Sequence, residues 1–245
     1  MKITTVLLLF IVSITGCSGQ EKVSAKKFDE IALTNKIDFI DPKFDQARFS
    51  CAFLLDYKGQ TYAVTAKHLL KLIKTEDMKS VYLQNSVKSW SMFPLDKKGE
   101  VVVADKLLNE NKIELLSEKA TFDNDWLVFS IKQNNTKIKP LQVRTTALKP
   151  GEKLYVIGWT RRMEEGAQRV YEFEYYKTVG NRILLKEIIV PEQFGGLSGA
   201  PLVDEQGLVV GLVSNGTIDP DTNKKYFSPC GINELVSFLD SYKQN

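Results

Sequence analysis

The sequence predicts an all-β fold in two halves, and three observations support this prediction. Short apolar runs alternate with turn signals at spacings of roughly 8 to 20 residues, as in barrels and sandwiches. Long amphipathic helical periodicity is rare, which argues against a helical protein. A polar break at residues 133–136 (QNNT) separates one series of predicted strands from a second. We therefore place the boundary between two β units near residues 133–140.

The first half contains a hairpin and three further strands. Residues 49–55 and 61–65 are apolar runs separated by Asp56, Tyr57, Lys58 and Gly59, which predicts a hairpin with the glycine at its turn. Aromatic and β-branched residues predict the remaining strands, which cover residues 81–83, 101–104 and 126–131.

The second half contains five predicted strands and a helix. A second hairpin is predicted around Gly207, which ends the polar turn 204–207. Apolar residues at helical spacing over residues 233–242 predict a C-terminal helix. No internal repeat is present, which excludes solenoids and propellers. The strands are predicted over residues 153–157, 170–176, 182–190, 201–203 and 208–213.

Composition indicates a folded globular protein and excludes several classes of partner. The chain has 245 residues, of which 43% are hydrophobic and 26% charged. Its net charge of +3 is spread without a basic run, so no nucleic-acid binding is indicated. A single histidine and three scattered cysteines do not make a metal site, and no cofactor is expected.

The N-terminus has the layout of a secretory signal peptide. Lys2 provides the positive charge, and residues 6–14 form an apolar core shorter than the roughly 20 residues that span a bilayer. Residues 14–17 (ITGC) resemble the lipobox of bacterial lipoproteins, whose cysteine is acylated and becomes the new N-terminus. The alternative is an ordinary signal peptide with an incidental cysteine.

The lipobox resemblance implies an anchored protein. It divides the chain into a signal peptide over residues 1–16, a polar tether over residues 17–30 and a domain over residues 31–245. It also implies a location in the bacterial cell envelope, with the domain facing the periplasm or the cell exterior. If Cys17 carries lipid, Cys51 and Cys230 remain, either as a disulfide or as free core residues.

Three short stretches carry the residue types of a hydrolase triad, namely a hydroxyl nucleophile, a histidine and a carboxylate. His68, the sole histidine, follows a predicted strand in YAVTAKH. Asp125 opens a predicted strand in NDWLV, and we favour it over Asp123 because it directly precedes the alternating residues. Ser198 lies in GGLSGAPL, just before the second hairpin.

The order of these residues along the chain separates the families of serine hydrolases. Here it is His68, then Asp125, then Ser198. The α/β-hydrolases place the histidine after the serine, and their G-x-S-x-G motif is broken here by Ala200. Subtilisins place the aspartate before the histidine. The order therefore excludes both of these arrangements.

The three stretches in this order resemble the trypsin-like (chymotrypsin-fold) peptidases, especially the bacterial members. In that family T-A-A-H carries the base, a D-x-A-L-like strand start carries the aspartate, and G-x-S-G-x-P-L carries the nucleophile. Residues 149–158 (KPGEKLYVIG) are similar to the first strand of the family's second barrel. The resemblance implies two six-stranded antiparallel β-barrels packed together, one at about residues 45–135 and one at about 140–232, with a C-terminal helix at about 233–242.

The resemblance also implies a role for each residue of the triad. Ser198 would attack the acyl carbon, His68 would act as general base and then as general acid, and Asp125 would orient His68. The expected function is that of a serine endopeptidase that acts on peptides or proteins through an acyl-enzyme, without a metal or an organic cofactor.

Backbone groups complete the implied site. The N–H groups of Gly196 and Ser198 would form the oxyanion hole, where glycine permits a turn that a Cβ would obstruct. The segment Ser214, Asn215 and Gly216 would pair with an extended peptide and form a wall of the specificity pocket. Glu192 and Tyr226 are further candidates for this pocket, and no preferred substrate residue is predicted.

Two residues depart from the family pattern. Lys67 replaces the second alanine before the histidine, so its cation either points to solvent or lowers the basicity of His68. Leu197 stands where trypsin-like zymogens keep an aspartate that receives a newly freed N-terminus. Activation of that kind is therefore not expected.

Three other functions remain open at this point. One is a binding module that keeps the shape of the triad without hydrolysis, and another is an esterase with the same site. The third is a structural lipoprotein, which predicts that His68 and Ser198 lie far apart. The sequence does not predict an oligomeric state.

Overall fold

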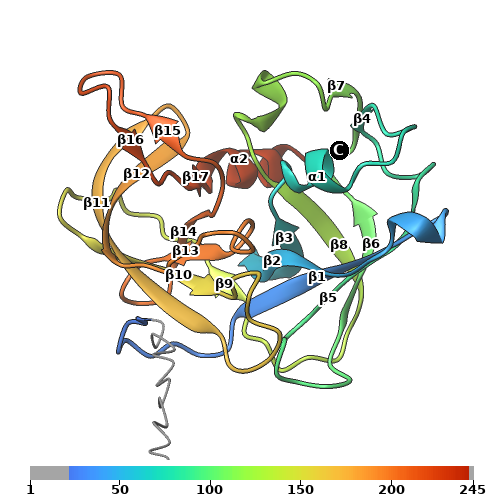
Figure 1. Cartoon of the computed structure of the whole chain (residues 1–245), viewed down its shortest axis with the longest axis horizontal. Helices are drawn as coiled ribbons and strands as arrows, with labels where there is room; N and C mark the ends of the chain where they lie inside the picture. The colour runs from blue at the N-terminus through green and yellow to red at the C-terminus, as the bar shows by residue number, and fades with distance from the viewer. Residues whose placement is uncertain (1–21, 243–245) are drawn as a thin grey trace, which may run out of the picture.

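The computed structural model describes residues 22–242, so the predicted signal peptide and Cys17 lie outside the described residues. Two β-barrels lie side by side, with the C-terminal helix α2 running across them (Figure 1). In chain order the elements are β1 (Ala32–Phe39), η1 (Pro42–Phe44), β2 (Gln46–Tyr57), β3 (Gln60–Thr65), α1 (Leu69–Ile73), β4 (Ser80–Val81), β5 (Val87–Phe93), β6 (Val102–Leu107), β7 (Asn111–Leu115), η2 (Ala120–Phe122), β8 (Leu127–Asn134), β9 (Leu141–Gln142), β10 (Lys153–Gly158), β11 (Arg169–Val179), β12 (Arg182–Ile189), β13 (Pro201–Val203), β14 (Val209–Leu212), β15 (Thr217–Ile218), β16 (Lys225–Tyr226), β17 (Cys230–Gly231) and α2 (Asn233–Tyr242).

The first barrel is a closed ring of six antiparallel strands. Its order is β1-β5-β6-β8-β3-β2, and pairing of β1 with β2 closes the ring. The short β9 adds to β2 as a parallel strand. The barrel begins with β1 at Ala32, earlier than the start near residue 45 that the sequence predicted.

The second barrel is closed in the order β10-β11-β12-β17-β14-β13. Its neighbouring strands are antiparallel, and β11 and β12 are joined by a tight turn in which Val179 faces Arg182. The prediction of two six-stranded antiparallel barrels with a C-terminal helix is therefore confirmed.

Strands β2 and β3 are buried on both faces, because they form the layer between the barrels. Alternate residues of a strand point to opposite faces, and here one face fills each of two cores. Ala52, Leu54 and Ala63 lie in the core inside the first barrel. Phe53 and Val64 lie in the core that is continuous with the second barrel. The strand that leads to His68 is thus held from both sides.

The two predicted hairpins are confirmed. In the first, Tyr57 pairs with Gln60, and the turn between them has positive φ at Lys58 (50°) and Gly59 (74°). In the second, β13 and β14 pair across the turn that contains Gly207, whose φ is 82°. Glycine tolerates this left-handed backbone at no steric cost.

The segment before β1 lies against the second barrel. The backbone N–H of Ser24 donates to Val170 O at 2.8 Å, and its hydroxyl donates to Glu172 at 3.1 Å. The N–H groups of Ile31 and Ala32 both donate to the side chain of Gln168 at 3.0 Å. Part of the stretch predicted as a tether is therefore docked on the domain. Within residues 22–242, no helix is long and apolar enough to cross a membrane.

Candidate active site

Strand pairing brings His68 and Asp125 to the same end of the first barrel. β3 and β8 pair antiparallel with Thr65 opposite Leu127, so the end of one strand lies beside the start of the other. His68 follows β3 as the N-cap residue of the short helix α1, whereas Asp125 is separated from β8 by Trp126 alone. The two residues are 57 positions apart in the sequence but adjacent in the fold.

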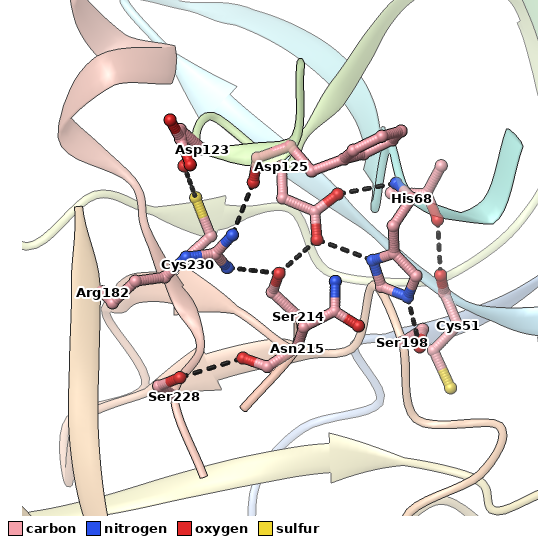
Figure 2. A network of polar contacts seen from close by, with 12 residues as sticks. Cys51, His68, Asp123, Asp125, Arg182, Ser198, Ser214, Asn215, Ser228 and Cys230 are labelled. Atoms are coloured by element: carbon pink, nitrogen blue, oxygen red, sulfur yellow. Dashed lines mark hydrogen bonds and ion pairs between the residues drawn. The ribbon is translucent and has the colours of Figure 1, made fainter. Parts of the chain in front are cut away.

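Asp125 holds His68 through both of its carboxylate oxygens. One oxygen accepts the backbone N–H of His68 at 2.6 Å, and the other lies 2.6 Å from Nδ1 of the imidazole ring (Figure 2). A carboxylate can only accept, so Nδ1 carries the proton and Nε2 is left as the acceptor. Asp125 is fully buried, and the competing candidate Asp123 is exposed and contacts Cys230 only through its carbonyl oxygen.

Ser198 completes the constellation from the second barrel. Its hydroxyl oxygen lies 2.8 Å from His68 Nε2, within hydrogen-bond distance. The carbonyl oxygen of Ser198 accepts the N–H of Cys51 at 2.9 Å, which fixes the turn that carries Ser198 to strand β2 of the first barrel. The structure therefore brings together all three of the residues that the sequence selected.

The turn before Ser198 exposes two backbone donors. The carbonyl of Gly195 accepts the N–H of Arg161 at 2.6 Å, so the N–H of the same peptide unit, on Gly196, points the opposite way. The carbonyl of Leu197 is likewise held by Ala200 N–H at 2.8 Å. Among residues 22–242 neither the N–H of Gly196 nor that of Ser198 has a hydrogen-bond acceptor. This is the arrangement that an oxyanion hole requires.

Position 196 requires a glycine for two reasons, its backbone conformation and the lack of space for a side chain. Its φ is 101°, and a Cβ added there would lie 2.3 Å from the backbone nitrogen of Arg161. No side chain can be accommodated against a backbone atom at that distance.

A hydrogen-bond chain behind the triad was not foreseen from the sequence. Ser214 donates its hydroxyl proton to the same oxygen of Asp125 that faces the imidazole, and Arg182 donates to Ser214. The guanidinium also donates to the carbonyl of Phe122. The sequence predicted only a backbone role for Ser214, and it offers no signal that pairs residues 125, 182 and 214, which come from three separate segments.

The segment predicted to pair with substrate has free backbone groups at alternate residues. Asn215 O accepts the hydroxyl of Ser228 at 2.9 Å, which ties this peptide to the body of the barrel. In the described chain, Ser214 C=O and Gly216 N–H have no hydrogen-bond partner, and Gly216 is exposed. An edge with free groups on one side can accept an extended peptide.

The cation of Lys67 is directed away from the imidazole. Its Nζ lies 2.5 Å from a carboxylate oxygen of Glu114 and 5.8 Å from the centre of the Trp126 ring. The side chain is 4% exposed, so the charge is neutralised by an ion pair and is not left beside His68. The expectation that this cation points to solvent is therefore wrong.

The second departure, Leu197, is part of the core. Its side chain is fully buried, and its N–H donates to Phe194 O at 3.1 Å. The turn that carries Ser198 is thus held by apolar packing and backbone hydrogen bonds, without a charged group at this position. Of the other pocket candidates, Glu192 forms a 3.5 Å ion pair with Arg162 and Tyr226 stacks on Tyr176.

The two described cysteines are free and buried, so they do not form a disulfide. Burial raises the pKa of Cys51 to about 12 and the pKa of Cys230 to about 11, because a thiolate is poorly solvated in the core. Neither thiol has nucleophilic character at neutral pH. The structure describes no cluster of three or more His, Cys, Asp or Glu side chains within residues 22–242 that could hold a metal ion.

Comparison with known proteins agrees with this architecture. The family model described as Trypsin matches residues 43–237. The chain therefore belongs to the trypsin family. A search of curated proteins by sequence finds no match.

Many solved structures are similar to the chain, including two that match most of its length. One, named GrC, is 16% identical with a TM-score of 0.61, and the match covers 91% of this chain and 98% of that one. The other is neuropsin, a serine protease expressed in the limbic system of mouse brain, which is 14% identical with the same TM-score and the same coverage. At these identities the likeness shows that the chain has the serine peptidase fold.

Proposed function

We propose that this protein is a serine endopeptidase that hydrolyses peptide bonds through an acyl-enzyme on Ser198. The observation that carries the proposal is the unbroken series of hydrogen bonds from Asp125 to His68 and from His68 to Ser198, at 2.6 Å and 2.8 Å. A nucleophile, a base and a group that orients the base, all within hydrogen-bond reach, form the signature of nucleophilic catalysis.

The geometry supports a complete reaction. The hydroxyl of Ser198 attacks the carbonyl carbon of the substrate while its proton passes to Nε2 of His68, and Asp125 stabilises the imidazolium that forms. The oxyanion is bound by the N–H groups of Gly196 and Ser198. His68 then gives its proton to the leaving amine, the C–N bond breaks and an ester remains on Ser198. Water, with His68 again as base, hydrolyses this ester and restores the free hydroxyl.

The free donors favour an enzyme over a binding module. Both N–H groups of the nucleophile turn are held open by hydrogen bonds to the neighbouring carbonyls of Gly195 and Leu197. A peptide-binding module needs the edge at Ser214 and Gly216 but has no use for two donors aimed beside a serine hydroxyl. Donors placed where charge develops in the transition state contribute to rate.

Covalent labelling tests the proposal directly. A fluorophosphonate reacts with a serine hydroxyl that is activated by a neighbouring base, so the folded protein is expected to be labelled, with the adduct on Ser198 by peptide mass mapping. His68→Ala should abolish labelling, because the base is removed, while the thermal unfolding midpoint stays close to that of the parent. A folded protein that is never labelled would support the binding module.

We also propose that the domain is held at a bacterial membrane by lipid on Cys17. The lipobox-like residues that end in Cys17 support this location, and the described domain begins only a few residues later in the sequence. Stable anchoring through acyl chains needs more than one chain, as lipoprotein modification provides.

Metabolic labelling with a palmitate analogue checks the anchor. The parent protein, expressed in a bacterium, is expected to incorporate the label and to fractionate with membranes. Cys17→Ser should lose both properties, whereas Cys51→Ser, which removes a thiol from the core, should keep them. Label retained by Cys17→Ser, or a parent found only in the soluble fraction, would contradict the proposal.

A further inference from the structure

A pocket of about 650 Å³ lies beside the catalytic histidine. It is bordered by His68, by Phe122 and by the exposed edge at Asn215 and Gly216. The same edge carries the free backbone groups that can pair with substrate. A peptide on this edge, with its reacting carbonyl at Ser198, therefore places side chains from the acyl side of the scissile bond over the pocket.

The pocket carries excess positive charge. Lys71, Lys119 and Arg182 line it, and Asp123 is the one acidic residue in its wall. Within the described chain, Lys71 and Lys119 have no ion-pair partner, and Lys71 Nζ lies over the Phe122 ring, 4.3 Å from its centre. Arg182 donates to two neutral oxygens, those of Ser214 and Phe122.

The residues that line this pocket thus carry two positive charges in excess. Elsewhere several lysines are paired, as Lys58 is with Asp240 at 2.6 Å and Lys186 with Glu174 at 2.8 Å. Uncompensated cations around a partly enclosed hollow attract an anion, and low-dielectric walls strengthen that attraction.

We propose that this pocket binds the carboxylate of an acidic side chain, so that the preferred substrates are peptides with Asp or Glu N-terminal to the residue whose carbonyl is attacked. The proposal rests on the proposed peptidase function. Lys71 and Lys119 bind the carboxylate through flexible ammonium groups. Arg182 adds positive charge to the wall of the pocket while it holds Ser214, and thereby Asp125, in place.

A positional peptide library tests the preference. Sets of peptides that differ only by Glu, Gln or Lys at each position N-terminal to the scissile bond are compared by kcat/KM. At one or more of these positions, we expect kcat/KM to be about tenfold higher for the Glu peptide than for the Gln peptide, and lowest for the Lys peptide. An effect of this size is reasonable for opposite charges that are only partly exposed to solvent. The preference should shrink as salt is raised from low to physiological strength, because the charges are screened.

Variants with matched charge identify the pocket. In the double variant Lys71→Gln with Lys119→Gln, the ratio of kcat/KM for the Glu peptide to that for the Gln peptide is expected to fall near unity. The control is Lys88→Gln with Lys132→Gln, which removes two positive charges from a different hollow on the first barrel and should keep the ratio of the parent. Equal loss in both double variants would overturn the proposal, because it would indicate an effect of net charge alone.

The outcomes separate this inference from the peptidase function. Hydrolysis of the library without any preference for Glu overturns the acidic subsite and leaves the peptidase function intact. If no peptide is cleaved, the peptidase function fails, and the subsite is then measured by fluorescence polarisation of labelled Glu and Gln peptides. Tighter binding of the Glu peptide, abolished only in the Lys71 and Lys119 variant, supports the subsite, and equal binding of both peptides overturns it.

Discussion

Ser198→Ala is expected to reduce the turnover of any cleaved peptide by about 10⁴-fold to 10⁶-fold, as removal of a triad nucleophile does in other serine peptidases. In the described chain, the hydroxyl of Ser198 is the only group within hydrogen-bond distance of His68 Nε2. Its removal therefore leaves the base without a nucleophile to activate. Purified parent and variant are compared by kcat and kcat/KM, with labelling by a fluorophosphonate as a second measurement.

The fold should be unaffected by this substitution. Ser198 is held by its carbonyl oxygen, which accepts the N–H of Cys51, and this hydrogen bond does not involve the side chain. Ser130→Ala, which removes a hydroxyl from the outside of the first barrel, serves as the control and should keep the kcat of the parent. If Ser198→Ala retained more than about a tenth of the activity, the nucleophile would have to be another group.

The constellation could be predicted from the sequence because its residues lie next to recognisable strands. His68 follows the apolar alternation of β3, and Asp125 precedes that of β8. Ser198 lies within a glycine-rich turn directly before a hairpin. The order of the three residues along the chain was enough to exclude the α/β-hydrolase and subtilisin arrangements. Because the chain has a single histidine, no other residue could take the place of the base in that order. The number and type of the barrels came from the family resemblance.

Strand β1 could not be predicted, because its buried residues include polar ones. Thr34 and Asn35 interrupt the apolar pattern of the strand, yet Asn35 is fully buried. Its amide donates to Phe49 O at 2.9 Å and to Cys51 O at 3.0 Å, and its oxygen accepts from Trp90 at 2.9 Å. A buried amide is stable only with such partners, and here they come from two other strands, β2 and β5. The predicted start of the first barrel was therefore too late.

The groups that support the triad were missed for a similar reason. Glu114 lies 47 positions from Lys67, and Ser214 lies 89 positions from Asp125. Each of these residues is unremarkable in its local segment, and each acquires its role through a contact across the fold. Polar contacts of this kind depend on the positions of side chains, which the periodicity of a sequence does not encode.

The backbone at Gly199, directly after Ser198, contacts both barrels. Its N–H donates to Val213 O in the second barrel at 2.9 Å. Its α-carbon faces the first barrel, where an added Cβ would lie 2.3 Å from Cys51 O and 2.6 Å from Thr65 Oγ1. Cys51 O is itself fixed, because it accepts the Thr65 hydroxyl at 2.7 Å and the amide of Asn35 at 3.0 Å.

Gly199→Ala is therefore expected to destabilise the protein by more than about 4 kcal/mol, among the largest effects of a single methyl group. The backbone φ of 82° is unfavourable for alanine by roughly 1–2 kcal/mol. The remainder comes from the contact with Cys51 O, which can be relieved only if the barrels separate or the nucleophile turn moves. Urea unfolding followed by tryptophan fluorescence measures the loss, and labelling of Ser198 should fall in any molecules that remain folded.

Gly99→Ala separates the two contributions. Gly99 has a similar φ of 84°, but an added Cβ would meet nothing within 4 Å. This variant should lose only the conformational cost of roughly 1–2 kcal/mol and should be labelled like the parent. If Gly199→Ala were no less stable than Gly99→Ala, close contact at Cys51 would not hold the nucleophile turn. The position of Ser198 would then depend on backbone hydrogen bonds alone, from Cys51 N–H to Ser198 O and from Gly199 N–H to Val213 O.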